Sequence, residues 1–314
     1  MIFENFEYSI NEYGNIVIDK YIGESEFVKI PDCINEKPVF EIGHSAFRGM
    51  KFITDVVFPK HLKLIGDYAF CECRGIKEFI IPDGLLETGS HCFYNCRALE
   101  KIEIPVTVEF IADGFIKNCD GLKEVVIVTN GKLCSGVVDL VTNIDNEIMV
   151  IFKNQNARLI LPEFGDEYIG NAPAMRFNTL THGSGAVFRR AFESKGFDYK
   201  LYDSFFFRAV LAEKTSTVIK MALCRLMYPY KLEEEGRNGY VKYVSENADK
   251  AVEYAAKTGD ISVIESMDEF EIFNAENIDD AIDMASKSGN SEISAYLLDV
   301  KHKKFGKKKK TFDL

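Results

Sequence analysis

Several features that would assign this chain of 314 residues to a particular class of protein are missing. Tryptophan is absent, and no apolar run approaches the ~18 residues that a membrane-spanning helix needs. The first eleven residues have neither the basic region nor the apolar region of a signal peptide, so the sequence predicts a cytoplasmic protein. Lysine and arginine number 38 against 49 acidic residues, and the resulting net charge of −11 disfavours nucleic acid and anionic lipid as general partners.

Catalytic and metal-binding patterns are also scarce. The five histidines include no pair spaced for a metal site, and the acidic residues are scattered, so we predict no catalytic residue, no cofactor and no metal. Cys73, Cys96 and Cys119 stand 23 residues apart, which predicts a column of small buried thiols. The alternative is zinc held by Cys73 and Cys96 together with Cys71 and Cys92, but the Cys-x-Cys spacing is poor for a structural zinc site.

What the sequence does contain is a repeat of 23 residues between Ile53 and Ile127. A fixed period of this size is typical of solenoids, in which each unit buries its apolar side against its neighbours. Residues of one type recur at this spacing in several columns: Pro59, Pro82 and Pro105; Phe47, Phe70 and Phe93; Gly43, Gly66 and Gly89.

The repeating unit resembles the BspA-like class of leucine-rich repeats. Each unit begins with Ile-Pro or Phe-Pro, continues through Ile-Gly and Ala-Phe or Cys-Phe to a cysteine, and ends in alternating apolar and polar residues. The match is close over 58–79 and 81–102, longer over 30–56 because Pro31 and Pro59 lie 28 residues apart, and weaker over 104–125. The resemblance implies a right-handed solenoid with a strand on the concave face of each turn, a bacterial source and a non-enzymatic, protein-binding role.

We predict four segments. A hairpin around Tyr13-Gly14-Asn15 caps the first apolar layer within 1–28, and the solenoid occupies 29–163, including degenerate final turns. A helical domain follows over 164–304, and 305–314 form a basic flexible tail. The predicted fold class is therefore α+β: an N-terminal leucine-rich repeat solenoid followed by an all-α domain.

The helical part shows its own repeat. Residues 251–260 align with 281–290, and each segment reads as a helix, a glycine cap and the start of a second helix. This arrangement resembles ankyrin-type helix pairs and implies a second protein-binding scaffold. Upstream, we predict one helix from Ser184 or Gly185 to Gly196, and a further helix that Asp203 caps.

The main functional hypothesis concerns outward-facing strand positions of the solenoid. Exposed apolar side chains there would be unfavourable unless a partner covers them. The preference of β-branched residues for strands, or packing of the chain's own second half, would explain them equally well. The predicted site, for an unidentified protein partner, consists of Asp55, Val57, Glu78, Ile80, Lys101, Glu103, Glu124 and Val126.

Three alternatives stay open. The region from His182 to Arg190 could serve a phosphate- or nucleotide-binding enzyme, with Gly183, Ser184, Gly185 and Arg189 at a helix start as the anion site, although the same residues also fit an ordinary turn. The chain could instead be a structural module that associates with itself. The lysine-rich segment 301–310 is either a solvated end or a contact for nucleic acid or an acidic partner.

Overall fold

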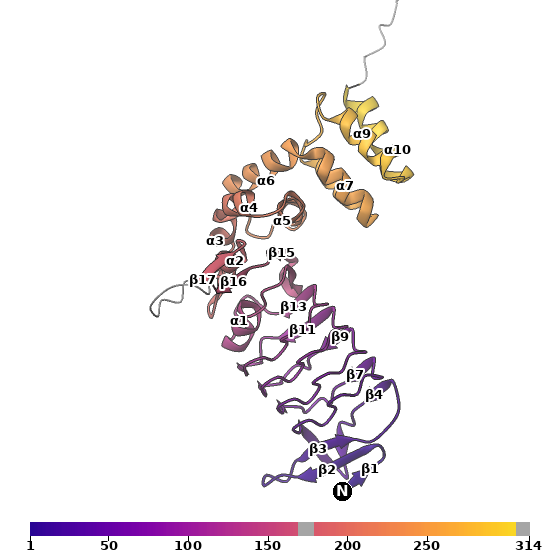
Figure 1. The fold of residues 1–314 in the computed structure, drawn as a ribbon, viewed down its shortest axis with the longest axis vertical. Coiled ribbons are helices and arrows are strands. Elements are labelled where there is room, and N and C mark those ends of the chain that lie inside the picture. The colour runs from indigo at the N-terminus through magenta and orange to yellow at the C-terminus, as the bar shows by residue number, and fades with distance from the viewer. Residues whose placement is uncertain (169–178, 306–314) are drawn as a thin grey trace, which may run out of the picture. The chain divides into compact units, whose positions relative to one another are not determined.

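The computed structural model describes residues 1–168 and 179–305, and these residues form two compact units, Met1–Tyr202 and Asp203–Leu314. The first unit is a β-solenoid and the second is helical (Figure 1). The predicted combination of a leucine-rich repeat solenoid with a helical region is confirmed. The division between the units falls within α3 (Tyr199–Ser204).

The solenoid begins with an antiparallel cap. Strands β1 (Ile2–Phe3), β2 (Phe6–Ile10) and β3 (Ile16–Tyr21) pair in sequence, and Gly14 adopts a left-handed conformation in the predicted turn. β3 then pairs in parallel with β6 (Lys37–Ile42), which is itself joined by β5 (Cys33–Ile34). The hairpin therefore supplies backbone partners to the first turn, which would otherwise end the sheet with unpaired groups.

Each turn of the solenoid contributes a strand to one face, which we call the strand face. In chain order these strands are β4 (Phe27–Lys29), β7 (Asp55–Val57), β9 (Glu78–Ile80), β11 (Lys101–Pro105), β13 (Glu124–Val128), β14 (Ile148–Phe152) and β15 (Ala157–Leu161). β4 pairs in parallel with β7 in one sheet, and β9, β11, β13 and β14 pair in parallel in another, which ends in the antiparallel pair β14–β15. A second parallel sheet, which the sequence did not predict, contains β6, β8 (Leu64–Ile65), β10 (Glu87–Thr88) and β12 (Phe110–Ile111).

Aromatic rings stacked along the solenoid axis fill the interior. Phe47, Phe70 and Phe93 are fully buried, with ring centroids 4.7 Å and 5.4 Å apart and planes within 17° of parallel. The predicted thiol column lies beside them, because the Cys73 and Cys96 Sγ atoms donate to carbonyl oxygens 26 residues earlier at 3.1 Å. Burial raises the pKa of the Cys73 thiol to about 12, so this thiol stays protonated at neutral pH.

A regular set of backbone hydrogen bonds joins each turn to the next between the strand face and the second sheet. In the first complete turn, the N–H groups of Ser45, Phe47 and Gly49 donate to carbonyls one turn later at 2.8–2.9 Å. The same three positions repeat 23 and 46 residues further on, and we call this series the turn ladder. Its first position in each turn has a left-handed backbone, at Ser45, Tyr68, His91 and Gly114.

The solenoid ends on elements that break the repeat. α1 (Ser135–Thr142) replaces part of a turn, and η1 (Lys153–Gln155) joins β14 to β15. The strand pair β16 (Gly165–Tyr168) and β17 (Thr179–His182) follows, then α2 (Gly185–Arg189), β18 (Phe192–Glu193) and β19 (Gly196–Phe197).

The helix predicted from Ser184 or Gly185 to Gly196 is wrong beyond Arg189. The chain turns back there because aromatic residues of the β18–β19 hairpin pack on the last solenoid strands: the Phe197 ring lies 5.4 Å from that of Phe152. The Tyr202 hydroxyl donates to the Ile160 carbonyl at 2.7 Å. These contacts join the β18–β19 hairpin and Tyr202 to the end of the solenoid, and the first compact unit extends to Tyr202.

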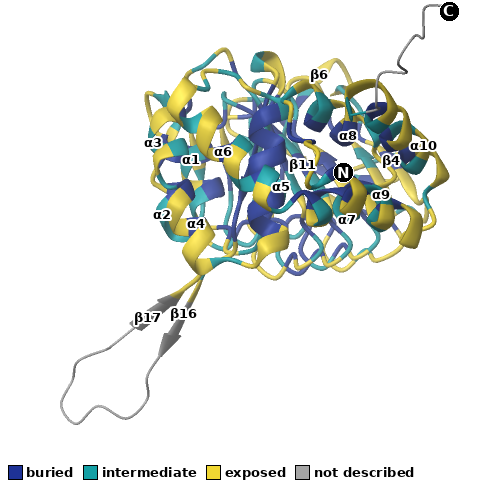
Figure 2. Cartoon of the chain, turned by 90° about the horizontal axis from the view of Figure 1, so that it is seen from above, coloured by how far each residue is buried: buried dark blue, intermediate teal, exposed yellow. Residues whose placement is uncertain are grey.

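The second unit consists of α4 (Phe206–Ala212), α5 (Thr215–Met227), α6 (Glu234–Glu246), α7 (Ala248–Thr258), α8 (Ile261–Glu269), α9 (Ile278–Lys287) and α10 (Ser291–Val300), followed by the short η2 (Lys301–Phe305). Most side chains of α5 are buried (Figure 2), and α5 packs against α4, α6, α7 and α8. The predicted helix–glycine–helix pairs correspond to α7–α8 and α9–α10. Residues 306–314 of the predicted tail lie outside the described residues.

The assignment of Asp203 as a helix cap is wrong. Phe205 stands at the N-cap of α4, and the Asp203 carboxylate instead accepts hydrogen bonds from the Arg225 guanidinium at 2.8 and 2.9 Å. It also accepts one from the Tyr240 hydroxyl at 2.7 Å. Arg225 and Tyr240 are fully buried, so these three residues form a buried polar network that joins α3, α5 and α6.

Candidate functional site

The parallel register aligns the predicted site residues of β9, β11 and β13 in two columns of the strand face, whereas β7, with Asp55 and Val57, pairs with β4. Lys101 pairs with Glu78 on one side and Glu124 on the other, and Glu103 pairs in the same way with Ile80 and Val126. Side chains alternate between the two sides of a strand, so residues two apart share a face. The side chains of these columns do not form one surface.

The first three strands carry exposed apolar side chains. Phe27 on β4 is 55% exposed, Val57 on β7 is 42% exposed and Ile80 on β9 is 56% exposed. β4 pairs with β7 with Lys29 opposite Val57, and β9 follows in the next turn. We call Phe27, Val57 and Ile80 together the apolar strand face. This set of exposed large side chains on three successive strands is a candidate binding surface.

The later strands are covered by the chain itself. Val126 is only 5% exposed, so its prediction as an exposed contact residue is wrong. Its strand pairs with β14, and the turn η1 that follows β14 packs close to β13. From this turn the Lys153 ammonium reaches back to both carboxylate oxygens of Glu103 at 2.8 and 3.0 Å.

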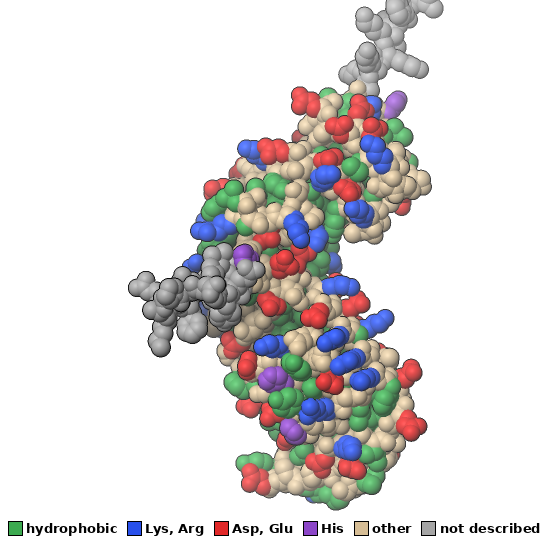
Figure 3. Space-filling view, in the orientation of Figure 1, with side chains coloured by type: hydrophobic (Ala, Val, Ile, Leu, Met, Phe, Trp, Pro, Cys, Tyr) green, Lys and Arg blue, Asp and Glu red, His purple; other side chains and the backbone are tan. Residues whose placement is uncertain are grey.

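The charged column is partly neutralised within the sheet. The Lys101 ammonium lies 2.6 Å from the Glu78 carboxylate, and this hydrogen bond raises the pKa of Lys101. Asp55 is exposed at the edge of the apolar strand face, and Glu124 is half-buried. Figure 3 shows acidic and basic side chains interspersed over the solenoid on the side in view, with hydrophobic side chains between them.

Phe27 is a member of the apolar strand face that the sequence analysis did not include. It precedes Asp55, its strand partner, by 28 residues and not by 23. The same offset of 28 separates Pro31 from Pro59, so applying the longer first repeat to the strand would have identified Phe27.

The residues of the proposed anion site have other roles. Arg189 is buried, and its guanidinium donates to the carbonyls of Pro162 at 2.7 Å and Asn146 at 2.9 Å, while it also lies over the Phe164 ring. Burial lowers its pKa to about 10, so the group still carries its charge at neutral pH. Its Nε atom has no hydrogen-bond partner among the described residues.

The glycines beside it pack against the backbone. The Gly185 N–H donates to the Glu163 carbonyl at 3.3 Å, and an added Cβ at Gly185 would lie 2.1 Å from the Pro162 oxygen. The Gly183 backbone is left-handed, and an added Cβ there would clash with the Glu163 carbonyl oxygen. Ser184 is buried. These residues fasten α2 to the end of the solenoid, and α2 spans only five residues.

A second apolar surface lies on the helical unit. Phe206, Phe207, Val210 and Leu211 of α4 line a groove of about 400 Å³ together with residues of α6, including Tyr243. Leu211 and Phe207 are largely exposed. This groove is a further surface on which a protein partner could bind.

Neither a metal-ligand cluster nor a membrane-spanning helix occurs in the described part of the chain. No group of three or more His, Cys, Asp or Glu side chains capable of holding a metal ion occurs within residues 1–168 and 179–305. None of the helices in that part of the chain combines the length and the apolar character needed to cross a bilayer.

The repeats identify the first unit. The family model for the BspA-type leucine-rich repeat region matches residues 21–136 in six copies. Residues 21–136 are BspA-type leucine-rich repeats. This region includes the apolar strand face and every complete set of bonds in the turn ladder, whereas α1 and the elements after it lie almost entirely outside it.

Solved structures of leucine-rich repeat proteins are similar to parts of the chain. The leucine-rich repeat protein of Treponema pallidum has 23% identity over 40% of this chain and 70% of its own, with a TM-score of 0.35. A leucine-rich repeat protein from Bacteroides capillosus has 24% identity over 41% of this chain and 98% of its own, with a TM-score of 0.39. One from Bacteroides ovatus has 29% identity over 34% of this chain and 27% of its own, with a TM-score of 0.30. A search of curated proteins found no match.

Proposed function

We propose that the chain is a non-enzymatic interaction scaffold whose BspA-type region binds a protein partner through the apolar strand face. The observation that carries the proposal is the exposure of Phe27, Val57 and Ile80 on three successive strands. Interface energy is usually concentrated in a few large apolar or aromatic side chains within a polar rim. Asp55 and the Glu78–Lys101 ion pair provide such a rim.

The preferred partner surface follows from this composition. It is a protein surface with its own apolar centre, because the three side chains offer no hydrogen-bonding groups of their own. Burying them would contribute about 25 cal/mol for each Å² of apolar area removed from water. Val57, Ile80 and Phe27 all favour strands, but this preference does not by itself place large apolar side chains in water.

A site-specific cross-linking experiment tests the proposal, with a photoreactive amino acid placed at Ile80 in the full chain. The matched control places it at Phe110, which is equally exposed but belongs to the second sheet. We expect one discrete cross-linked protein from Ile80 in lysate of the source cells and none from Phe110. The double variant Val57→Lys, Phe27→Lys should abolish the Ile80 product, whereas Leu86→Lys should leave it unchanged. Identical products from both positions would contradict the assignment of the site.

The phosphate-binding alternative receives no support from the site geometry. Its arginine is buried on two carbonyl oxygens, and its glycines pack against residues 162 and 163. Self-association would place a second copy on the apolar strand face, and the Ile80 cross-link would then join two copies of the chain. The same experiment therefore separates a distinct partner from a second copy.

A further inference from the structure

The turn ladder has three complete sets of hydrogen bonds. Its donors begin at Ser45, Tyr68 and His91, and in each set three N–H groups at alternate positions donate to alternate carbonyls of the next turn at 2.8–3.0 Å. In the last complete set, His91, Phe93 and Asn95 donate to residues 113, 115 and 117. In each set the acceptors are carbonyls at every second residue of a segment that itself consists of successive turns.

The fourth set is open. The equivalent donors are Gly114, Ile116 and Asn118, and none of the three N–H groups has a hydrogen-bond partner within residues 1–168 and 179–305. Their acceptors would come from the next turn, 23 residues after those of the previous set, but α1 occupies that stretch of sequence. A helix uses its carbonyls for its own hydrogen bonds, so α1 cannot supply the acceptors that a further turn would provide.

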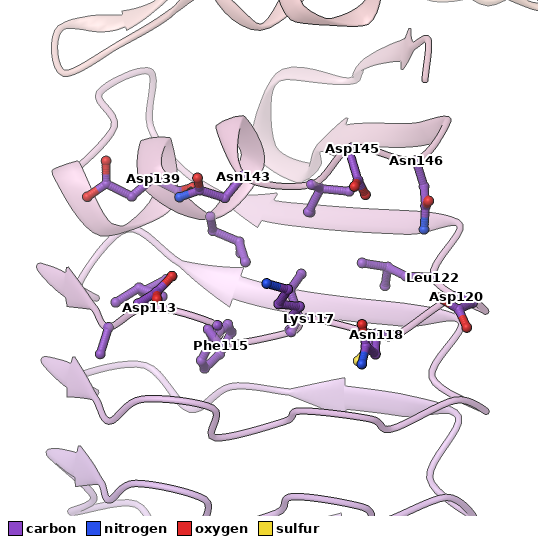
Figure 4. A pocket seen from close by; sticks show the side chains of 17 residues that line it. Asp113, Phe115, Lys117, Asn118, Asp120, Leu122, Asp139, Asn143, Asp145 and Asn146 are labelled. Carbon is purple, nitrogen blue, oxygen red and sulfur yellow. The ribbon is translucent and has the colours of Figure 1, made fainter. Parts of the chain in front are cut away.

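A cavity lies where the missing segment would run. Its volume is about 440 Å³, and it is bounded below by residues 111–122 of the last turn and above by α1 and the loop that follows it. Figure 4 shows floor residues Asp113, Lys117 and Asn118 facing roof residues Asp139 and Asn143 across the gap. We call this cavity the end slot.

The roof of the end slot is held at both ends. At the N-terminus of α1, the Gly136 N–H donates to the Glu109 carbonyl at 3.1 Å and the Ser135 hydroxyl donates to the same oxygen at 2.8 Å. Beyond the C-terminus of α1, Arg189 donates to the Asn146 carbonyl at 2.9 Å. The end slot is therefore a gap of fixed height and not a place where α1 would settle onto the last turn.

The side chains of the slot give it a charge preference. Four aspartates line it, at positions 113, 120, 139 and 145, against the single cation of Lys117. All four aspartates are exposed, whereas Phe115 in the floor and Leu140 in the roof are buried. The lining therefore combines backbone donors for carbonyls with an acidic rim for cations.

We propose that the end slot binds a peptide segment that carries a lysine or arginine. Carbonyls of this segment accept hydrogen bonds from Gly114, Ile116 and Asn118, as the carbonyls of the next turn do elsewhere in the ladder. Its basic side chain pairs with Asp113 and Asp139. A whole turn of a second copy does not fit this site, because α1 closes it from above.

The test is a titration of the full ¹⁵N-labelled chain with the blocked peptide acetyl-Ala-Val-Ala-Lys-Ala-Val-Ala-amide, and with the twin in which glutamate replaces lysine. We expect the lysine peptide to move the amide resonances of Gly114, Ile116 and Asn118, and the glutamate twin to leave them in place. The double variant Asp113→Asn, Asp139→Asn should weaken binding roughly tenfold, as expected for the loss of two exposed ion pairs. Lys117→Ala should strengthen it, and Asp55→Asn, far from the slot on the strand face, should change nothing.

Two further variants and two further probes make the test decisive. Asn143→Trp fills the slot from the roof and should abolish binding, whereas Asn143→Ala should preserve it. No movement of the three amides at millimolar lysine peptide would overturn the proposal. So would equal binding of a single blocked lysine, which offers the charge without the alternate carbonyls, or the same amide shifts with calcium chloride alone.

Discussion

The two units of the chain are stabilised in opposite ways. In the solenoid the same contact recurs at each turn: ring on ring in the phenylalanine column, thiol on carbonyl in the cysteine column, and N–H on carbonyl in the turn ladder. In the helical unit the Asp203–Arg225–Tyr240 network occurs once, where three helices meet. Removing one solenoid contact therefore affects one layer among several similar layers, whereas removing a member of the network affects a contact that nothing else duplicates.

The difference also determines where each unit has unsatisfied groups. A repeating ladder satisfies its donors only while the repeat continues, so its unpaired groups collect at the end, where α1 interrupts it. A single network can be completed locally, and Asp203 accepts from two residues without help from a neighbouring repeat. The end slot is thus a consequence of how the solenoid is built.

The largest effect is expected from removing one ring of the phenylalanine column. Phe70→Ala should destabilise the solenoid by about 3–5 kcal/mol, because the ring is fully buried between Phe47 and Phe93 and leaves a cavity. Hydrogen exchange measured along the chain should show faster exchange in the turns on both sides and unchanged exchange in α7–α10. Phe110→Ala, at an exposed ring, is the control and should change stability by less than about 0.5 kcal/mol. Loss of protection in both units together would show that they do not unfold separately.

A smaller effect is expected in the helical unit from Tyr240→Phe. The variant keeps the buried ring but removes the hydroxyl that donates to Asp203 at 2.7 Å, and a hydrogen bond to a charged group contributes about 1.5–3 kcal/mol. Protection should fall in α5 and α6 but not in the solenoid. Tyr243→Phe, on the same helix and half-exposed, should cost less. An equal loss in both variants would mean that the hydrogen bond from Tyr240 to Asp203 contributes no more to stability than the hydroxyl of the half-exposed Tyr243.

The sequence predicted the parts that repeat and missed those that occur once. The 23-residue spacing of proline, phenylalanine and cysteine indicates stacked turns, because each column needs the same residue type at the same height. Asp203 was wrongly assigned as a cap because no local pattern reveals its partners. These are Arg225 and Tyr240, which lie 22 and 37 residues away on other helices.

The candidate site shows the same limit. Alternation along each strand identified Val57 and Ile80 correctly as outward and exposed. It could not show that the turn at residues 153–155 would cover Val126, because that contact depends on where β14 places the turn. The end slot was equally hidden, since it results from α1, which replaces part of a turn.

The smallest effects are expected at the caps of the two helix pairs, and these compare repeats within the helical unit. Asp260 accepts from the Ser262 N–H at 3.0 Å at the start of α8, and 30 residues later Asn290 accepts from the Ile293 N–H at 3.1 Å at the start of α10. Replacement by alanine should cost about 1 kcal/mol at each position. Asp260→Ala should cost a few tenths more at low salt, because a carboxylate also interacts with the helix dipole, and the excess should vanish when salt is added. Amide exchange in the first turns of α8 and α10 measures both losses, with Glu265→Ala in the exposed middle of α8 as the control. If the two losses differ by more than this salt-sensitive excess, the two pairs are not equivalent repeats, despite their 30-residue spacing.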